Sequence, residues 1–468
     1  MRYLLFSFAF SLFFCSFLHT DSSPLSERIP CLITIFIHGT LKPAKFSLSV
    51  INTILRDKIE KSLYERMIYN LRKTQYLYQS QPMQGIGLIP VNKENENSKI
   101  GVHCMKDLFE KQYNFYNTQP TTRFYYTFGW NGLLNIQKRQ EEGANLYHAL
   151  EQEVNRLRSQ GYEPSINIYA YSYGGAVALN LAKAKQSSSE APSFFINQLV
   201  LLAMPVQKET DYLAADTDLF KKIYHIYSTE DNVQASDLFS TQKELFSRHT
   251  FTARYNFHLP ENLIQVRFRL TKKVNRLPKE ITPNDIEENP SLLFTKRIQR
   301  VHMDPGHTEF WNLGWGDWWY RKELPISPLP VIALVPSITH FLQIYAKKNT
   351  SITFDYCPLF NAALLIPCHQ KKGIAVSMLT KDLWNNLKEQ GNNCRPENYT
   401  FENRRYEEFK ALEKAHEELK NNKRLEKANR QKLKTSFLFF TRKIGTDFFP
   451  NVQKIRHAHL LRTKVKHV

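Results

Sequence analysis

Short runs rich in apolar residues predict β-strands in the first half of the chain. These runs occupy residues 31–37, 124–128, 165–170, 198–203 and 222–227. The first of them, residues 31–37, is a continuous β-branched run, which is typical of a strand covered on both faces of a parallel sheet. The pattern therefore predicts a central sheet of parallel strands.

Helical periodicity alternates with these strands. The segment before the third strand places its apolar residues on one helical face, namely Leu146, Leu150, Val154 and Leu157. Gly161 is the predicted stop of that helix. A run of small and apolar residues, 176–185, follows the third strand directly. Strands alternating with helices indicate βαβ units, so we predict an α/β fold with a mostly parallel central sheet and flanking helices.

The same pattern divides the chain into regions. We predict one α/β domain over residues 29–345. Within it, residues 41–120 are too long for an ordinary loop and are predicted to form a helical insertion. Residues 346–400 contain cysteines and are predicted to be irregular. Residues 401–468 are predicted to form a charged helix, exposed or bound to a partner, and then a basic tail.

The N-terminal segment predicts export. Residues 1–18 hold one Arg and then an apolar run of about sixteen residues, which is the order of a secretory signal. The run is shorter than the roughly twenty residues of a membrane-spanning helix. An uncleaved anchor is the alternative, because no small-residue cleavage site is visible. We therefore predict a signal peptide or anchor over residues 1–22, and a periplasmic, secreted or membrane-associated protein.

Cysteine usage excludes a fold built on disulfides, because the chain has only 6 cysteines, one of them in the predicted signal. Cys357, Cys368 and Cys394 lie within 38 positions of one another and are candidates for one disulfide, whose pairing the sequence leaves open. Cys31 and Cys104 are predicted to be buried thiols.

Positive charge is concentrated at the C-terminal end. The chain has 63 Lys and Arg against 44 Asp and Glu, a formal charge of +19. Residues 401–468 alone hold 18 Lys and Arg against 8 Asp and Glu, which is more than half of the excess. No nucleic-acid-binding module accompanies this charge, and we expect no nucleic acid partner. Phe pairs within the basic tail 431–468 predict attachment to an anionic membrane or a protein, with a solvated tail as the alternative.

Residues 170–175, Ala-Tyr-Ser-Tyr-Gly-Gly, join the third predicted strand to a helix. A serine on such a tight turn is exposed at the carboxyl edge of the sheet, and small neighbours such as Ala170 and Gly174 let the chain turn. The backbone N–H of Tyr173 and the start of the helix then face a developing oxyanion. The segment predicts that Ser172 is a nucleophile, with an ordinary turn and a capping serine as the alternative.

A second motif follows the first predicted strand, where His38, Gly39 and Thr40 stand. An oxyanion hole of this type takes its second N–H from a loop after an early strand. Gly39 permits close backbone approach, and the Thr40 N–H is the predicted donor. An ordinary turn at the end of a strand is the alternative.

A nucleophilic serine also needs a base, and the base needs an acid that holds its tautomer. Asp231 follows the strand at 222–227 and is the predicted acid, with Glu230 as the adjacent competitor and Asp237 less well placed. His307 follows a turn and starts an apparent helix, so it is the predicted base. His302 is the nearby alternative.

The segments Phe-Ile-His-Gly-Thr (36–40) and Tyr-Ser-Tyr-Gly-Gly (171–175) resemble the α/β-hydrolase superfamily, and within it the lipase and esterase branch. The resemblance covers about residues 29–320. The catalytic triad that it implies is Ser172, Asp231 and His307, and the oxyanion donors that it implies are the backbone N–H groups of Thr40 and Tyr173. The chain departs from the branch at two positions of the serine motif. Tyr171 stands where lipases commonly place His, and Ala170 stands where the usual G-x-S-x-G pattern has glycine.

The resemblance implies a serine hydrolase that cleaves carboxylic esters of acyl or lipid substrates through an acyl-enzyme, with the insertion 41–120 as a lid or cap. A thioesterase or acyltransferase with the same triad is an alternative, and so is an inactive hydrolase-fold protein that binds a membrane or a partner. We expect no cofactor. The spacing of His302, Asp304 and His307 could face a metal, but no further ligand cluster accompanies it, so we expect none.

Overall fold

The computed structural model describes most of the chain between residues 28 and 421. The described ranges are 28–41, 62–92, 101–116, 122–188, 193–235, 247–275, 277–315, 323–346, 351–368, 370, 372–397 and 399–421. The predicted signal 1–22 and the basic tail 431–468 lie outside them. In the part of the chain that is described, no helix combines the length and the apolar character that crossing a membrane requires.

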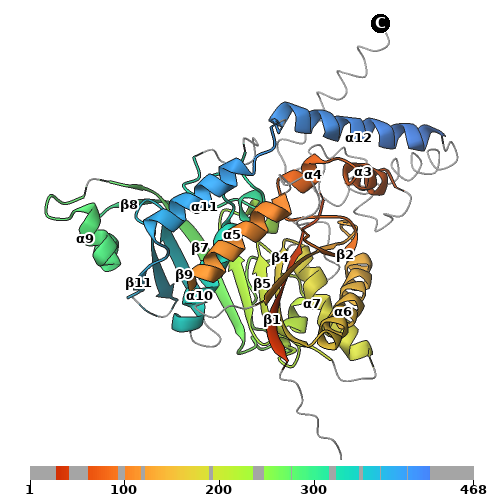
Figure 1. The fold of residues 1–468 in the computed structure, drawn as a ribbon, viewed down its shortest axis with the longest axis horizontal. Coiled ribbons are helices and arrows are strands. Elements are labelled where there is room, and N and C mark those ends of the chain that lie inside the picture. Colours follow the sequence, from red (N-terminus) through yellow and green to blue (C-terminus); the bar gives the residue numbers. More distant parts are fainter. Residues whose placement is uncertain are drawn as a thin grey trace, which may run out of the picture.

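The strands of the described residues form one eleven-stranded sheet (Figure 1). They are β1 (Ile29–Ile37), β2 (Gly87–Pro90), β3 (Thr122–Gly129), β4 (Tyr162–Tyr171), β5 (Ile196–Leu202), β6 (Ile223–Tyr227), β7 (Leu263–Val274), β8 (Arg300–Met303), β9 (Ser351–Cys357), β10 (Ala362–Pro367) and β11 (Ile374–Ser377). Their order is β11-β10-β9-β7-β6-β5-β4-β1-β3-β2, and β8 pairs with β7 outside this path.

The sheet is mostly parallel, as the sequence predicts. Neighbouring strands from β3 through β1, β4, β5, β6 and β7 to β9 pair in parallel. The strands β2, β8, β10 and β11 add antiparallel pairs. The five predicted strands correspond to β1, β3, β4, β5 and β6. The sequence analysis did not predict the remaining strands, including β10, although its residues Ala362–Pro367 are all apolar. The protein is therefore a mixed α/β protein.

Helices cover both faces of the sheet. They are α3 (Leu63–Leu71), α4 (Tyr76–Gln79), α5 (Gly101–Tyr116), α6 (Ile136–Ser159), α7 (Gly174–Ser187), α8 (Asn232–Ala235), α9 (Pro283–Glu288), α10 (Val335–Tyr345), α11 (Lys381–Asn393) and α12 (Phe401–Asn421). The apolar face predicted for α6 is buried, and Gly161 follows its C-cap with a positive φ of 86°. This is the left-handed conformation in which glycine commonly ends a helix.

Two apolar cores lie on opposite faces, because successive side chains of a strand point to opposite sides. In β1, Ile33 and Ile35 lie in the core that α6 and α7 cover. Phe36 lies in the other core with residues of α5 and α10, and its ring centroid is 5.1 Å from that of Phe109 of α5. Both faces of β1 are thus buried, which accounts for its unbroken apolar sequence.

The predicted insertion, residues 41–120, contains α3, α4, β2 and α5 among its described residues. The strand β2 pairs with β3 and extends the sheet by one strand. Helix α5 packs directly over the central strands, where the ring centroids of Phe109 and Tyr169 of β4 are 4.9 Å apart. The described part of the insertion therefore belongs to the hydrophobic core as well as to the surface.

The prediction of an irregular region at 346–400 is wrong. This region contains β9, β10, β11 and α11, and β9 pairs in parallel with β7. The sequence signal is weak because Asp355 interrupts the apolar run of β9. Asp355 is fully buried and pairs with Arg269 of β7 at 2.9 Å and Arg300 of β8 at 2.7 Å. Burial opposes its ionisation, but the hydrogen bond from His302 and the two guanidinium charges outweigh it and lower the pKa of Asp355 to about 2.

The candidate cysteines do not form a disulfide, because the described cysteines are all free thiols. Cys357 pairs with Ala362 at the turn of the β9–β10 hairpin, whereas Cys368 bonds Ser351 at the opposite end. The length of the hairpin therefore separates these two cysteines, at about 3.3 Å per residue. Cys31 and Cys104 are buried, as predicted. Cys394 shares a hydrogen bond with Cys104, a partner that the sequence analysis did not consider.

The charged helix α12 packs along α3 (Figure 1). Its small residues Ala411 and Ala415 are buried in this contact. Arg66 of α3 pairs with Glu418 at 3.5 Å, and the Tyr76 hydroxyl of α4 donates to Glu408 at 3.3 Å. One face of the predicted helix is thus buried against the chain itself. Residues beyond 421 lie outside the described ranges.

Candidate active site

The order of the strands reverses beside β1. β1 and β4 are parallel neighbours, but the chain leaves β1 for β3 on one side before it crosses to β4 on the other. Loops at the carboxyl ends of such strands diverge, and open α/β sheets bind ligands in the crevice between them. Residues 38–40 follow β1 and Ser172 follows β4, so the topology brings both predicted motifs to one edge.

Ser172 lies on a strained turn between β4 and α7. Its φ is 51°, in the left-handed region that non-glycine residues rarely adopt. Such a conformation costs about 1–3 kcal/mol and persists only where its surroundings hold it. The Ser172 N–H donates to the Leu202 carbonyl at 2.9 Å, and the Gly175 N–H donates to the Ser172 carbonyl at 2.9 Å. These bonds keep Ser172 at the sheet edge.

Small residues let the loop after β1 lie against this turn. A Cβ on Gly39 would stand 2.7 Å from the Ser172 Cβ, closer than such atoms approach. A Cβ on Gly174 would meet the His38 carbonyl oxygen. Ala170 is fully buried at the end of β4. The close approach for which the sequence singled out these residues is present in the structure.

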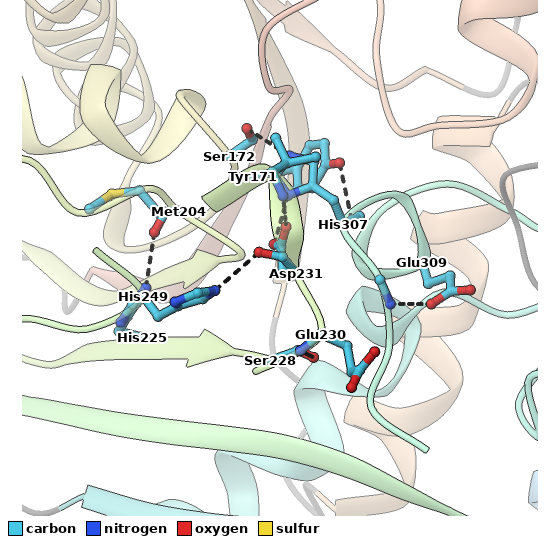
Figure 2. A network of polar contacts seen from close by, with 12 residues as sticks. Tyr171, Ser172, Met204, His225, Ser228, Glu230, Asp231, His249, His307 and Glu309 are labelled. Carbon is cyan, nitrogen blue, oxygen red and sulfur yellow. Dashed lines mark hydrogen bonds and ion pairs between the residues drawn. The ribbon is translucent and has the colours of Figure 1, made fainter. Parts of the chain in front are cut away.

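Ser172, His307 and Asp231 form a continuous chain of hydrogen bonds (Figure 2). The Ser172 Oγ lies 3.0 Å from His307 Nε2, and His307 Nδ1 lies 2.7 Å from Asp231 Oδ2. A carboxylate only accepts, so Nδ1 carries the proton and Nε2 presents its lone pair to the serine hydroxyl. Both distances are within direct proton-transfer range, about 2.6–3.2 Å.

Asp231, the predicted acid, is fixed in a buried position after β6. Asp231 is fully buried, and its Oδ1 accepts from the Val233 N–H at 3.1 Å. Glu230, the adjacent competitor, is exposed, and in Figure 2 its carboxylate points away from His307. Asp237 lies outside the described residues. Of the two described carboxylates, the structure therefore brings only Asp231 to the histidine.

Tyr171, the residue before the serine, holds His307 in place. Its hydroxyl donates to the His307 backbone carbonyl at 3.1 Å, and its ring lies 4.9 Å from the imidazole (Figure 2). The Trp311 ring stacks on Tyr171 at 5.3 Å. Burial, and then the charge of Asp231, raise the pKa of Tyr171, so the phenol stays protonated and can donate. The sequence analysis noted Tyr171 only as a departure from the lipase pattern.

The loop that carries His307 has further supports. The Gly306 N–H donates to the buried Glu309 carboxylate. Asp304 accepts from Arg267 at 3.0 Å and from the Thr229 hydroxyl at 2.5 Å. These contacts join the loop to β7 and to the turn before Asp231.

Other histidines near the site have different partners. His302, the alternative base of the sequence analysis, lies 3.5 Å from Asp355 in the ion cluster of β7, β8 and β9. His249 contacts the Asp231 backbone carbonyl at 3.0 Å (Figure 2). His225 contacts the Met204 carbonyl at 3.3 Å, and burial lowers its pKa to about 4. Among the described histidines, only His307 has a recorded contact with Ser172.

Tyr173 starts the helix that follows the serine. It is the N-cap of α7 with a φ of −67°, so its N–H belongs to the positive end of that helix. Its hydroxyl accepts from Gln207 at 2.9 Å, and the Arg139 guanidinium stacks over its ring at 4.3 Å. These contacts hold the residue whose N–H is a predicted oxyanion donor.

His38 is buried, and it lies in the same loop as Thr40, whose N–H is the other predicted oxyanion donor. Its Nδ1 lies 2.6 Å from the Gly39 carbonyl oxygen. Its Nε2 lies 2.7 Å from a guanidinium nitrogen of Arg72 and 3.3 Å from the Trp130 N–H. Burial, followed by the charge of Arg72, lowers the pKa of His38 to about 3. Sequence reasoning missed Arg72 and Trp130, because neither stands in a recognisable motif.

No group of metal-binding side chains occurs among the residues that the structure describes. The sequence pattern of His302, Asp304 and His307 does not converge on one point. His302 contacts Asp355, Asp304 contacts Arg267, and His307 contacts Asp231.

Comparisons with known proteins add little. No protein-family model matches the sequence, and no curated protein matches it. Among solved structures, the Tle1 effector bound to the VgrG spike of the type 6 secretion system is similar at 11% identity and a TM-score of 0.21. That match covers 44% of this chain and 46% of the Tle1 chain, less than half of either. Functional inference therefore depends on the site geometry.

Proposed function

We propose that the protein is a serine hydrolase of the α/β-hydrolase type that cleaves carboxylic esters, as lipases and esterases do. One observation carries the proposal: Ser172, held at a positive φ between a strand and a helix, bonds to His307, which bonds to buried Asp231. This combination of a strained turn with a nucleophile, base and acid is the arrangement that acyl-transfer enzymes use. The mostly parallel sheet and the loop of residues 38–40 also support it.

The proposed reaction follows from the hydrogen bonds. Ser172 Oγ attacks the ester carbonyl while His307 Nε2 takes its proton, and Asp231 stabilises the imidazolium that forms. The Thr40 and Tyr173 N–H groups stabilise the oxyanion of the tetrahedral intermediate. His307 then protonates the leaving alcohol. Water attacks the acyl-enzyme with His307 again as the base, and the acid product leaves.

Substrate and location complete the proposal. The lipase-like motif pair supports an apolar acyl chain in the substrate. The apolar N-terminal run, residues 3–18, supports export through a signal peptide or anchor. The basic tail with its Phe pairs supports attachment to an anionic membrane.

A fluorophosphonate probe tests the nucleophile. We expect labelling of the wild type and none of the Ser172→Ala variant, with Ser188→Ala, beyond the end of α7, as a matched control that still labels. Hydrolysis of p-nitrophenyl esters of increasing chain length then defines the acyl preference. Faster turnover of thioesters, or transfer to added alcohols, would instead assign a thioesterase or an acyltransferase. A folded protein that neither labels nor hydrolyses would contradict the proposal and favour a binding protein.

A further inference from the structure

We propose that Arg72 and His38 are positioning residues that orient the peptide between Gly39 and Thr40, and through it the Thr40 N–H of the oxyanion hole. The inference rests on the proposed function. It assigns a role in catalysis to the insertion, because Arg72 is the C-cap of α3.

The hydrogen bonds of His38 allow one tautomer. The Gly39 carbonyl only accepts, so the ring nitrogen 2.6 Å from it, Nδ1, carries the proton. Arg72 and the Trp130 N–H only donate, so Nε2 is the unprotonated nitrogen that accepts from both. The low pKa of His38 agrees with a neutral ring at all physiological pH values. Arg72 therefore selects the tautomer that donates to Gly39.

The Gly39 carbonyl and the Thr40 N–H belong to one planar trans peptide, in which they point in opposite directions. Holding the carbonyl toward His38 therefore directs the N–H away from His38. Glycine has the greatest backbone freedom of any residue, so this peptide needs an external hold. Gly39 cannot be replaced by a stiffer residue, because a Cβ would stand 2.7 Å from the Ser172 Cβ.

Arg72 and His38 are themselves held in place. Arg72 also donates to the Trp130 carbonyl, and the Tyr78 hydroxyl donates to the Arg72 carbonyl at 2.5 Å. The Trp130 indole N–H donates to the His38 carbonyl at 2.7 Å, and the two rings stack at 5.7 Å. Burial lowers the pKa of Arg72 to about 10, which still leaves it charged at neutral pH.

The test compares Arg72→Ala with Arg66→Ala, which removes an arginine of the same helix that pairs with Glu418 instead. Hydrolysis of p-nitrophenyl butyrate is measured at several concentrations. We expect Arg72→Ala to lower kcat about 100-fold, the effect of losing one oxyanion donor, with KM changed less than about threefold. Millimolar guanidinium added to the Arg72→Ala variant should raise its kcat at least tenfold. Arg66→Ala should keep wild-type kcat with or without guanidinium.

Two results overturn the inference. If the wild type hydrolyses the ester, Ser172→Ala does not, and Arg72→Ala stays within about threefold of the wild-type kcat, then the inference fails while the proposed function stands. If the wild type shows no hydrolysis, both fail. Should Arg72→Ala not fold, Arg72→Lys replaces it, with an expected loss of about tenfold, because lysine keeps the charge but not the two-pronged donor geometry.

A different observation carries a second inference: we propose that Cys104 and Cys394 are a disulfide site that links α5 to α11. The two helices lie side by side (Figure 1). Pairs of contacting side chains succeed one another along them in antiparallel order. Lys111 bonds to Asn386, and Asp107 bonds to Gln390 at 3.2 Å. One helical turn further along, the next pair of facing side chains is Cys104 and Cys394, which are buried and share a hydrogen bond.

The chemistry requires a disulfide as oxidant, and glutathione disulfide serves as the probe. The Cys394 thiolate attacks glutathione disulfide and releases one glutathione. The Cys104 thiolate then attacks Cys394 Sγ in the mixed disulfide and releases the second glutathione, so two protein thiols are oxidised and one glutathione disulfide is reduced. The hydrogen bond that Cys104 donates lowers the pKa of Cys394, which favours Cys394 as the attacking thiol.

Peptide mapping after equilibration with glutathione disulfide tests this site. We expect one peptide pair joining Cys104 to Cys394, lost in Cys104→Ser, and a melting temperature raised by several degrees in the wild type alone. The exposed Cys368 should take a single glutathione and serves as the reactivity control. Glutathione on Cys368 with both Cys104 and Cys394 still reduced would overturn the inference. So would a link from Cys394 to Cys357 or Cys368.

Discussion

The hydroxyl of Tyr171 bonds to the backbone carbonyl of His307, 3.1 Å away, so the residue before Ser172 holds the loop that carries His307. We expect Tyr171→Phe to keep the ring contacts with His307 and Trp311 and to lose this bond. A net hydrogen bond contributes about 1 kcal/mol, so kcat should fall about five- to tenfold with little change in KM. Steady-state ester hydrolysis checks this, with the half-exposed Tyr212→Phe as control. Equal loss in both variants would contradict it.

Asp231 and Glu230 are adjacent carboxylates, of which only Asp231 reaches the histidine. We expect Asp231→Asn to lower kcat about 10⁴-fold, because an amide can donate to Nδ1 and so stabilise the wrong tautomer of His307. Glu230→Gln should keep activity within about threefold, because Glu230 is exposed. The two variants are compared by kcat/KM on one ester. A larger loss in Glu230→Gln would reassign the acid.

Gly39 has no room for a side chain beside Ser172. We expect Gly39→Ala to lower the free energy of unfolding by about 1–3 kcal/mol through overpacking and to reduce kcat at least tenfold through displacement of the elbow. Gly85→Ala is the matched control, because its new Cβ would meet only the movable end of the Ile89 side chain. Urea unfolding and ester hydrolysis measure both effects. Wild-type behaviour of Gly39→Ala would contradict the packing argument.

Two buried histidines make stability depend on pH. Burial lowers the pKa of His38 to about 3, with Arg72 as a second cause, and that of His225 to about 4. In the unfolded chain both return to about 6.5, so below that pH the unfolded state binds more protons and the free energy of unfolding falls. The stability that these residues contribute is complete above pH 6.5. It is lost as pH falls toward 4 for His225 and 3 for His38.

The expected slope is about 1.4 kcal/mol per pH unit for each histidine in this window. Urea unfolding between pH 7 and pH 4.5 measures it. His225→Gln should reduce the slope by about one histidine's share, whereas the exposed His416→Gln should leave it unchanged. An unchanged slope in His225→Gln would show that His225 is protonated in the folded protein.

Local sequence was sufficient to predict those strands and turns that are encoded by residues adjacent in the chain. The apolar runs of β1, β3, β4, β5 and β6 could be predicted because both faces of each strand are buried. It was also sufficient to single out Ser172, Asp231 and His307, since strand-end turns and chain order are visible in sequence. β9 escaped prediction because the charge of Asp355 is compensated by Arg269 and Arg300 from other strands, and such pairing leaves no local pattern.

Tertiary structure alone decided the contacts between distant segments. Asp231, and not Glu230, lies against His307, and His302 contacts Asp355 instead. Arg72 of the insertion reaches His38. Cys104, and not Cys357 or Cys368, lies beside Cys394. The physical reason is the same in each case. Periodicity and turn chemistry are encoded over a few adjacent residues, whereas the direction of a side chain and its partner are set by how whole helices and strands pack.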